Sequence, residues 1–128
     1  MIYNGTLMLI QVLKSKLHRG VVTDAKLYYP GSIAIDQALM DAAGIVHYEA
    51  VLVVSLNSGN RVQTYAVPAP AGSGRVDILG AAAQLIRLGD TVIIMAFAYC
   101  TPEEAGQVKP KVVVLDDRNR IVNNGPER

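Results

Sequence analysis

The residues with the clearest chemical potential are Gly31 and Ser32, which follow Pro30 in a Tyr-Pro-Gly-Ser segment. Gly31 has no side chain, so its backbone can adopt strained dihedral angles and the Ser32 hydroxyl can approach the preceding carbonyl carbon. Attack by that hydroxyl would convert the amide into an ester. β-Elimination would then release a carboxylate at Gly31 and leave dehydroalanine, which hydrolyses to a pyruvoyl group. Taken alone, a Pro-Gly-Ser segment indicates only a tight turn.

Residue types and spacing argue against several other kinds of site. His18 and His47 lie far apart without paired acids, so we expect no metal site. Cys100 is the only cysteine, which excludes an internal disulfide and a zinc site built from several thiolates. Residues 72–74, Gly-Ser-Gly, lack the lysine and the strand-to-helix context of a phosphate-binding loop. The segment around Ser32 therefore remains the main candidate.

Several ordered segments resemble the family of pyruvoyl-dependent aspartate 1-decarboxylases. Its amino-terminal third is similar to residues 13–19 (LKSKLHR), residues 29–36 (YPGSIAID) and residues 39–45 (LMDAAGI). The resemblance continues through residues 57–65, 80–83 and 89–94. It covers most of the chain in order and in register, which short shared motifs do not produce by chance.

The resemblance implies a mainly β fold, namely a double-psi β-barrel of about six strands with short crossover helices. It also implies a homotetramer with active sites between neighbouring subunits. The single domain, residues 1–128, would cut itself between Gly31 and Ser32 into a β-chain of residues 1–31 and an α-chain of residues 32–128. The product would be a lyase that converts L-aspartate to β-alanine and CO₂ for pantothenate and coenzyme A biosynthesis. Part of the family needs a helper protein for this maturation.

The same resemblance implies roles for individual residues. Ser32 would become the covalent pyruvoyl cofactor, and Tyr65 would donate the proton that quenches the carbanion left when CO₂ departs. Lys16 and Arg61 would bind the substrate carboxylates. Further matches are Thr64, needed for self-cleavage and close to substrate, the main-chain contacts of Gly80, Ala81 and Ala82, and the less specific pocket positions Tyr29 and Ile93.

These residue types suit the implied chemistry. L-aspartate carries two carboxylates, so two fixed cations are natural recognition elements, and a guanidinium can bind one of them bidentately. A pyruvoyl group would condense with the substrate amine and act as an electron sink, as pyridoxal phosphate does. Without the resemblance, Lys16 would be interpreted as a solubilising strand residue, Arg61 as a surface charge and Tyr65 as a packed aromatic.

Strand alternation adds one observation about these residues. Arg61 and Tyr65 fall on the same face of a strand, so they could share a pocket, whereas Thr64 falls on the other face. If all three line one site, either a β-bulge or a neighbouring subunit must bring Thr64 to it.

Two departures from the family pattern stand out. The family usually has Asn directly before its Gly-Ala-Ala-Ala segment, whereas this chain has Leu79, whose side chain makes no hydrogen bond. An alternative function follows, a non-catalytic or poorly self-processing barrel that binds a small acidic ligand. Residues 1–7 also precede the usual start near Met8, and we interpret them as a disordered extension or a start codon placed too early.

The elements that must position these residues can be predicted from periodicity and turn signals. Asp36 and Gly44 are suited to begin and end a short helix. A β-hairpin is indicated by residues 50–56 and 61–67, which flank Asn-Ser-Gly-Asn. Other predicted strands are residues 7–17, 21–27, 33–35, 76–79, 91–99 and 111–115, with a helix over 80–88, a capped turn at 101–104 and a frayed tail after Val122.

Composition limits the broad class. Apolar residues make up 51% of the chain, but no run approaches the length of a membrane-spanning helix, and the start lacks the features of a secretory signal. We therefore expect a soluble cytoplasmic protein. Twelve Lys and Arg against eleven Asp and Glu form no basic stripe, so we expect neither nucleic acid nor membrane as a partner.

Overall fold

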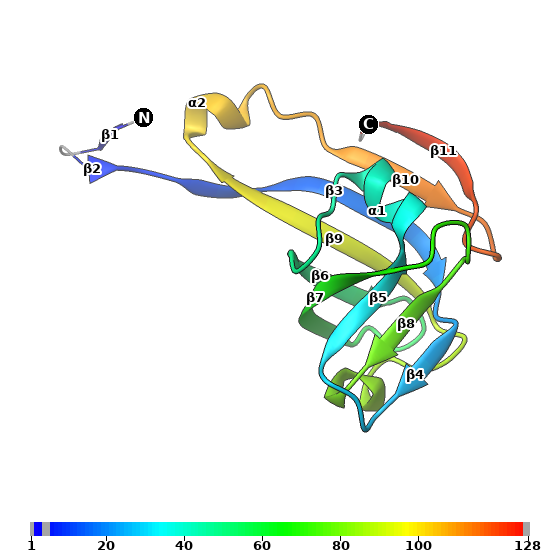
Figure 1. Cartoon of the computed structure of the whole chain (residues 1–128). Helices are drawn as coiled ribbons and strands as arrows, with labels where there is room; N and C mark the ends of the chain where they lie inside the picture. Colours follow the sequence, from blue (N-terminus) through cyan, green and yellow to red (C-terminus); the bar gives the residue numbers. More distant parts are fainter. Residues whose placement is uncertain (1, 4–5, 127–128) are drawn as a thin grey trace.

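The computed structural model describes residues 2–3 and 6–126. Within them, nine strands form one mixed sheet in the order β11-β10-β3-β9-β6-β7-β5-β8-β4 (Figure 1). The strands are β3 (Ile10–Val21), β4 (Asp24–Lys26), β5 (Ser32–Asp36), β6 (Ala50–Ser55), β7 (Arg61–Ala69), β8 (Val76–Leu79), β9 (Thr91–Cys100), β10 (Lys111–Leu115) and β11 (Ile121–Pro126). The predicted mainly β class is confirmed, with more strands than the predicted six or so.

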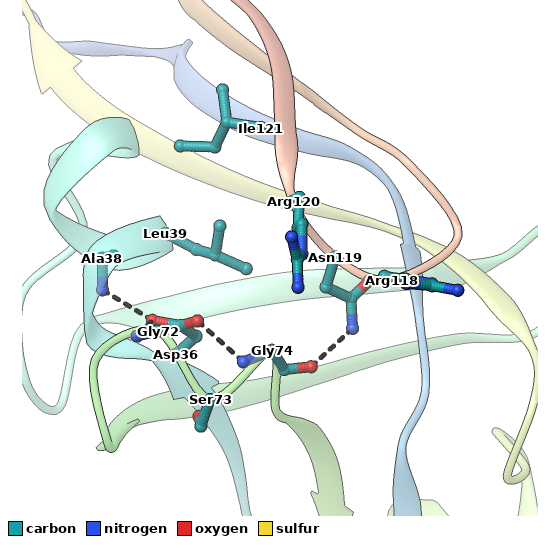
Figure 2. A pocket seen from close by; sticks show the side chains of 10 residues that line it. All are labelled: Asp36, Ala38, Leu39, Gly72, Ser73, Gly74, Arg118, Asn119, Arg120 and Ile121. Atoms are coloured by element: carbon teal, nitrogen blue, oxygen red, sulfur yellow. Dashed lines mark hydrogen bonds between the residues drawn. The ribbon is translucent and has the colours of Figure 1, made fainter.

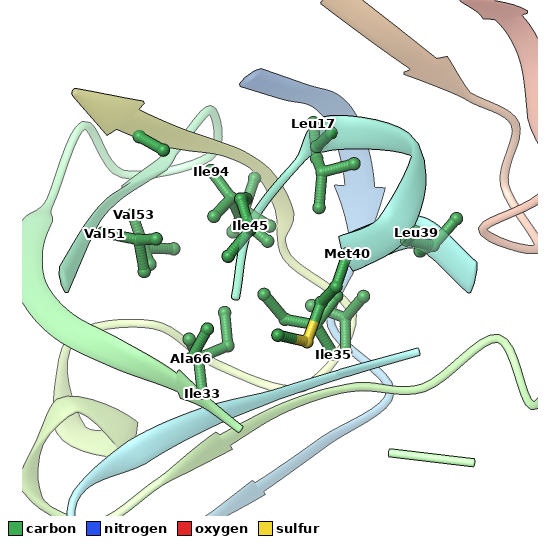
Figure 3. Packing of buried hydrophobic residues seen from close by; sticks show 14 of the residues in the cluster. Leu17, Ile33, Ile35, Leu39, Met40, Ile45, Val51, Val53, Ala66 and Ile94 are labelled. Atoms are coloured by element: carbon green, nitrogen blue, oxygen red, sulfur yellow. The ribbon is translucent and has the colours of Figure 1, made fainter. Parts of the chain in front are cut away.

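The sheet curves around one core, as in a barrel. Buried side chains from strands near both ends of the sheet belong to the same cluster, for example Val113 of β10 and Ile78 of β8. Figure 3 shows Leu17, Ile33 and Ile94 pointing into this cluster from three different strands. Small aliphatic side chains suit such an interior, because alternate residues of each strand point inward and must fit a narrow space.

The predicted helix after β5 is confirmed as α1 (Gln37–Ala43). The Asp36 carboxylate accepts a hydrogen bond from the Ala38 N–H at 2.8 Å, and Gly44 ends the helix with a φ of 70°. Leu39 and Met40 of α1 are buried against the core (Figure 3). The capped turn is also confirmed, as α2 (Pro102–Ala105), where Thr101 and Glu104 form a capping box.

Three predicted elements differ from the structure. The helix predicted over 80–88 is only a 3₁₀-helix, η1 (Ala81–Gln84), because Gly80 has no side chain to cap its start and Gly89 donates its N–H to the Val22 carbonyl instead of ending a longer helix. The first strand begins at Ile10 and runs on to Val21, since β-bulges keep it paired with β9. The tail predicted to fray after Val122 instead pairs with β10 through residues 123–126.

At the amino terminus, β1 (Ile2–Tyr3) and β2 (Thr6–Leu7) pair with each other and are not part of the main sheet. Residues 1, 4 and 5 of the predicted disordered extension lie outside the described residues, so that extension stays a prediction. Across the described part of the chain, no helix has the length and apolar character needed to cross a membrane.

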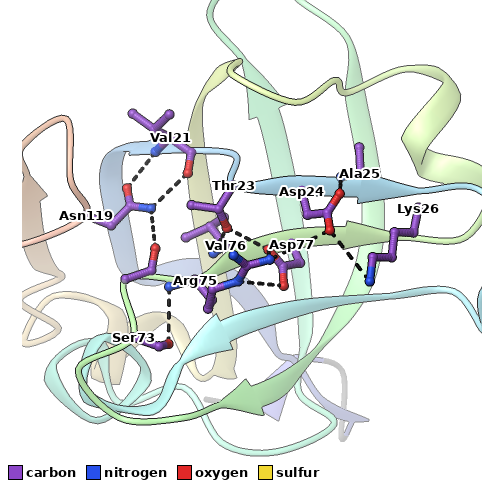
Figure 4. Close-up of polar contacts among 11 residues, drawn as sticks. Val21, Thr23, Asp24, Ala25, Lys26, Ser73, Arg75, Val76, Asp77 and Asn119 are labelled. Atoms are coloured by element: carbon purple, nitrogen blue, oxygen red, sulfur yellow. Dashed lines mark hydrogen bonds and ion pairs between the residues drawn. The ribbon is translucent and has the colours of Figure 1, made fainter.

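A polar network joins β3, β8 and β4 below the core (Figure 4). Asn119 is 2% exposed, and its side-chain amide binds the backbone of Val21 and of Gly74. Thr23 donates to Asp77 at 2.6 Å, and Arg75 lies within 3.7 Å of Asp24. These contacts fix the short strands β4 and β8, which carry the residues beside Ser32.

Candidate active site at the start of strand β5

Ser32 is the first residue of β5 and is only 6% exposed. On one side β5 runs antiparallel to β8, and Ser32 lies directly opposite Leu79. Leu79 in turn pairs with Lys26 of β4. Leu79 is therefore the immediate cross-strand neighbour of the predicted nucleophile.

Gly80 packs directly on the backbone that would be cut. A Cβ atom at this position would lie 2.6 Å from the Gly31 Cα and 3.0 Å from the carbonyl oxygen of Tyr29. Gly80 also has a φ of 89° and donates its N–H to the Lys26 carbonyl at 2.8 Å. Only glycine satisfies both the positive φ and the close approach. The residue thus holds the segment of residues 29–32, here called the scissile segment, against the end of β8.

Tyr65 and Thr64 approach the scissile segment from the other side of β5. Strands β5 and β7 are parallel, with Ile33 opposite Ala66. Continuing this register toward the chain start brings Tyr65 beside Ser32 and Thr64 beside Gly31. Because Ala66 and Ile33 face the core, Tyr65 and Ser32 share the outward side, while Thr64 points inward.

The two predicted carboxylate-binding cations lie further away within one chain. Arg61 and Tyr65 are on the same face of β7, about 13 Å apart along the strand. Lys16 lies on β3 opposite Met95 of β9, and β3 is three strands from β7, about 14 Å along the sheet. Ile93 lies on β9 opposite Val54 of β6. Counted along the sheet, Lys16 and Arg61 thus lie further from Ser32 than Tyr65 and Gly80 do.

Ala81 and Ala82 follow Gly80 in η1, next to the scissile segment. Ala82 packs against the core cluster, whereas Ala81 is exposed. Tyr29 is 52% exposed, and the Lys26 ammonium lies 5.0 Å from the centre of its ring. Gly80 thus lies beside Gly31, with Ala81 and Ala82 directly after it, and the contact of this segment with substrate stays a prediction.

A pocket of about 540 Å³ lies elsewhere, at the opposite end of β5 (Figure 2). Its floor is Asp36, whose carboxylate accepts N–H groups from Gly72 at 3.0 Å and from Gly74 at 2.9 Å. Arg118 and Arg120 line its rim. None of the predicted site residues lines this pocket, so we interpret its polar groups as an anchor for α1 and the loop after β7.

The scissile segment is suited to forming a pyruvoyl group from Ser32. Ser32 is largely buried, and the Gly31 Cα packs against Gly80, so the peptide that would be cut is shielded from water and held in place. Within the described residues, no group of three or more His, Cys, Asp or Glu side chains could hold a metal ion.

Comparison with known proteins agrees with this geometry. Residues 8–122 match the family model described as aspartate decarboxylase. The chain belongs to the aspartate decarboxylase family. Proteins named aspartate 1-decarboxylase are similar over most of their length, one from Caldicellulosiruptor saccharolyticus being 53% identical over 90% of both chains. One from Acaryochloris marina is 53% identical over 89% of this chain and 87% of its own.

Among solved structures, the rationally designed protein mkDPBB_sym1 is similar with a TM-score of 0.45 and 18% identity, over 68% of this chain and 96% of its own. The resemblance implies only a substrate contact for Gly80 and does not predict its packing on Gly31. A signal for it was present in the sequence, since a glycine directly after a short strand often marks a close backbone approach.

Proposed function

We propose that this chain is a pyruvoyl-dependent aspartate 1-decarboxylase that converts L-aspartate to β-alanine and CO₂ after cutting itself between Gly31 and Ser32. The enzyme class, its pyruvoyl dependence and its place in pantothenate synthesis follow from membership of the aspartate decarboxylase family. The observation that carries the residue assignments is the convergence of Ser32, Thr64, Tyr65 and Gly80 at one end of β5.

In self-cleavage, the chain supplies a nucleophile and a fixed peptide. The Ser32 hydroxyl attacks the Gly31 carbonyl carbon, and the C–N bond breaks as the C–O bond forms. Gly80 holds the scissile segment from one side. Thr64, which lies across from Gly31 in the continued β5–β7 register, is suited to hydrogen-bond the carbonyl oxygen while it carries negative charge. Loss of the Ser32 Cα proton then expels the Gly31 carboxylate and leaves dehydroalanine at residue 32. Water hydrolyses this group to the pyruvoyl end and releases its nitrogen as ammonia.

In turnover, a pyruvoyl group supplies a sink for the electrons left when CO₂ departs. Tyr65 holds a phenolic proton on the same side of the sheet as Ser32 and donates it to the substrate carbon. Lys16 and Arg61 bind the two carboxylates of L-aspartate. Because Lys16 lies three strands from β7, we propose that it reaches the site from a neighbouring subunit of a homotetramer.

The protein is proposed to act in the cytoplasm, where a soluble biosynthetic enzyme would meet L-aspartate.

The proposed decarboxylation can be tested directly. Purified protein is incubated with L-aspartate, and β-alanine is measured beside a Ser32→Ala variant. Parent protein should form β-alanine and lose activity when treated with borohydride in the presence of substrate, whereas the variant should form none. Equal β-alanine formation by both would contradict the assignment of Ser32.

The alternative of a non-catalytic or poorly self-processing barrel rests on Leu79, which lies opposite Ser32. A Leu79→Asn variant separates the two functions. We expect both proteins to cut, because Gly80 and Thr64 are present in each. If only the Asn variant cuts and forms β-alanine, the alternative is favoured and a helper protein becomes worth seeking.

A further inference from the structure

The turn between α1 and β6 contains a tyrosine in an unusual conformation. Tyr48 has a φ of 73°, in the left-handed region that bulky side chains rarely adopt, and it is 69% exposed. Glycine or asparagine would adopt this conformation with less strain. A tyrosine that is mostly exposed in a strained conformation therefore calls for a reason other than stability.

The backbone of this turn is held on both sides. The Tyr48 N–H donates to the Ala66 carbonyl at 2.7 Å, and the Ala66 N–H donates to the Glu49 carbonyl at 2.9 Å. The Glu49 carboxylate accepts the Lys14 ammonium at 2.6 Å and the Val46 N–H at 3.0 Å. These contacts anchor the turn to β7 next to Tyr65, so the position of the Tyr48 ring is fixed relative to that strand.

The Tyr48 ring lies against Tyr65, the predicted proton donor. The two ring centres are 6.0 Å apart with an interplanar angle of 45°, a tilted arrangement that aromatic pairs favour. The His47 ring stacks on Tyr48 at 3.8 Å and 19°. Tyr65 is itself 36% exposed, so in this chain the neighbouring rings supply part of the packing that limits its rotation.

We propose that Tyr48 is a positioning residue for the decarboxylation reaction, and that its ring keeps the Tyr65 phenol directed at the substrate carbon that must receive a proton. This inference rests on the proposed function, in which Tyr65 is the donor. A donor must lie within hydrogen-bond reach of the carbon it protonates, and a displacement of about 1 Å can reduce the rate by up to about a hundredfold. The strained backbone at Tyr48 serves to place the Tyr48 ring against Tyr65.

The test compares Tyr48→Asn with Tyr48→Phe in the full-length protein. Asn suits a left-handed backbone but lacks the ring, whereas Phe keeps the ring and loses only the hydroxyl. We expect both variants to cut completely. Tyr48→Asn should unfold at the same or a higher temperature than the parent, yet its kcat for β-alanine should fall about tenfold with little change in KM. Tyr48→Phe should retain kcat within about twofold.

The effect of Tyr48→Asn in a Tyr65→Phe background distinguishes a positioning role from a purely structural one. In a Tyr65→Phe background, Tyr48→Asn should have almost no further effect on kcat, because the group that it positions is gone. A parental kcat in Tyr48→Asn, or an equal loss in both backgrounds, would overturn the inference while leaving the proposed function intact. A parent that cuts but forms no β-alanine would remove the proposed function itself, and this inference with it.

Discussion

At the scale of single residues, Gly80 packs directly against the Gly31 backbone, a contact that the sequence does not predict. Ala at this position would place a Cβ 2.6 Å from the Gly31 Cα, in addition to adopting an unfavourable φ of 89°. We expect Gly80→Ala to slow self-cleavage at least tenfold, because the scissile segment must move away from its reactive position. The uncut fraction, measured over time by denaturing mass spectrometry, gives the rate.

Gly89→Ala is the matched control for this substitution. Gly89 also has a positive φ, 86°, but a Cβ there would meet nothing within 4 Å. Both variants are expected to lose about 1 to 2 kcal/mol of stability from the backbone conformation alone. Only Gly80→Ala should cut slowly. Equal cleavage rates in the two variants would show that close packing on Gly31 is unimportant for the reaction.

Tyr65 is expected to act in turnover and not in maturation. Tyr65→Phe removes the phenolic proton and keeps the ring, so the chain should cut normally while kcat falls by about 10² to 10⁴, the usual value of a general acid. Cleavage is read by mass and turnover by β-alanine formation on the same sample. Normal turnover would transfer the proton-donor role to another group or to water.

The candidate site could be predicted in part from residue types. Gly31, Ser32, Tyr65 and Gly80 were predicted as site residues, and the structure brings them together at the start of β5. Their proximity depends on parallel pairing of β5 with β7, a contact between segments far apart in the sequence that local periodicity does not encode. For the same reason, the sequence does not decide whether a β-bulge or a neighbouring subunit brings Thr64 to the site.

At the scale of elements, Asp36 links strand β5, helix α1 and the loop after β7. It is 3% exposed, and its carboxylate accepts N–H groups from Ala38, Gly72 and Gly74. Asp36→Ala would leave these donors without their acceptor and should lower the free energy of unfolding by about 3 kcal/mol. Thermal or urea unfolding measures the loss.

Asp36→Asn is the matched variant for this prediction, because its one carbonyl oxygen can still cap α1. Its loss should be smaller than that of Asp36→Ala. Both proteins should still cut between Gly31 and Ser32, because Asp36 lies at the far end of β5 from the scissile bond. A stability equal to the parent in Asp36→Ala would show that the network contributes nothing to folding.

Elements with a strong signal in their own residues are predicted correctly, including strands 76–79 and 111–115 whose partners are distant in the sequence, and elements without such a signal are not. Helix α1 carries both of its caps in the sequence, and the hairpin of β6 and β7 carries its turn. Strand β11 was predicted as a frayed tail because Asn123 and Asn124 are polar, yet it forms through backbone hydrogen bonds to β10, which side-chain patterns do not report. The helix predicted over 80–88 is wrong beyond Gln84, because the residue before it must be a glycine to pack on Gly31 and therefore has no side chain to cap a longer helix.

At the scale of the whole molecule, the separation of Lys16 from Ser32 predicts an active site shared between subunits. Lys16→Ala should cut but fail to bind substrate, and Ser32→Ala should keep Lys16 but form no cofactor. Each variant alone should be inactive. When they are co-expressed, about a quarter of the sites in randomly mixed oligomers would combine an intact Lys16 with a processed Ser32 from different chains. Recovered β-alanine formation of that order is expected.

Mixed oligomers must first be verified, for example by two different affinity tags and by light scattering. Recovery of activity in verified mixed oligomers would support the shared site. Complete inactivity of such oligomers would mean that Lys16 and Ser32 act within one chain, and the sheet would then have to bring β3 closer to β5 than its strand order indicates.

The proposed activity depends on cleavage of the bond between Gly31 and Ser32, and the mass of the purified protein under denaturing conditions tests this cleavage most directly. The mass spectrum should show two species. One is residues 1–31 ending in a free carboxylate, and the other is residues 32–128 beginning with a pyruvoyl group in place of Ser32. The Ser32→Ala variant should give one intact chain with the same fold. A parent protein that remains a single uncut chain after long incubation, and forms no β-alanine, would contradict the account.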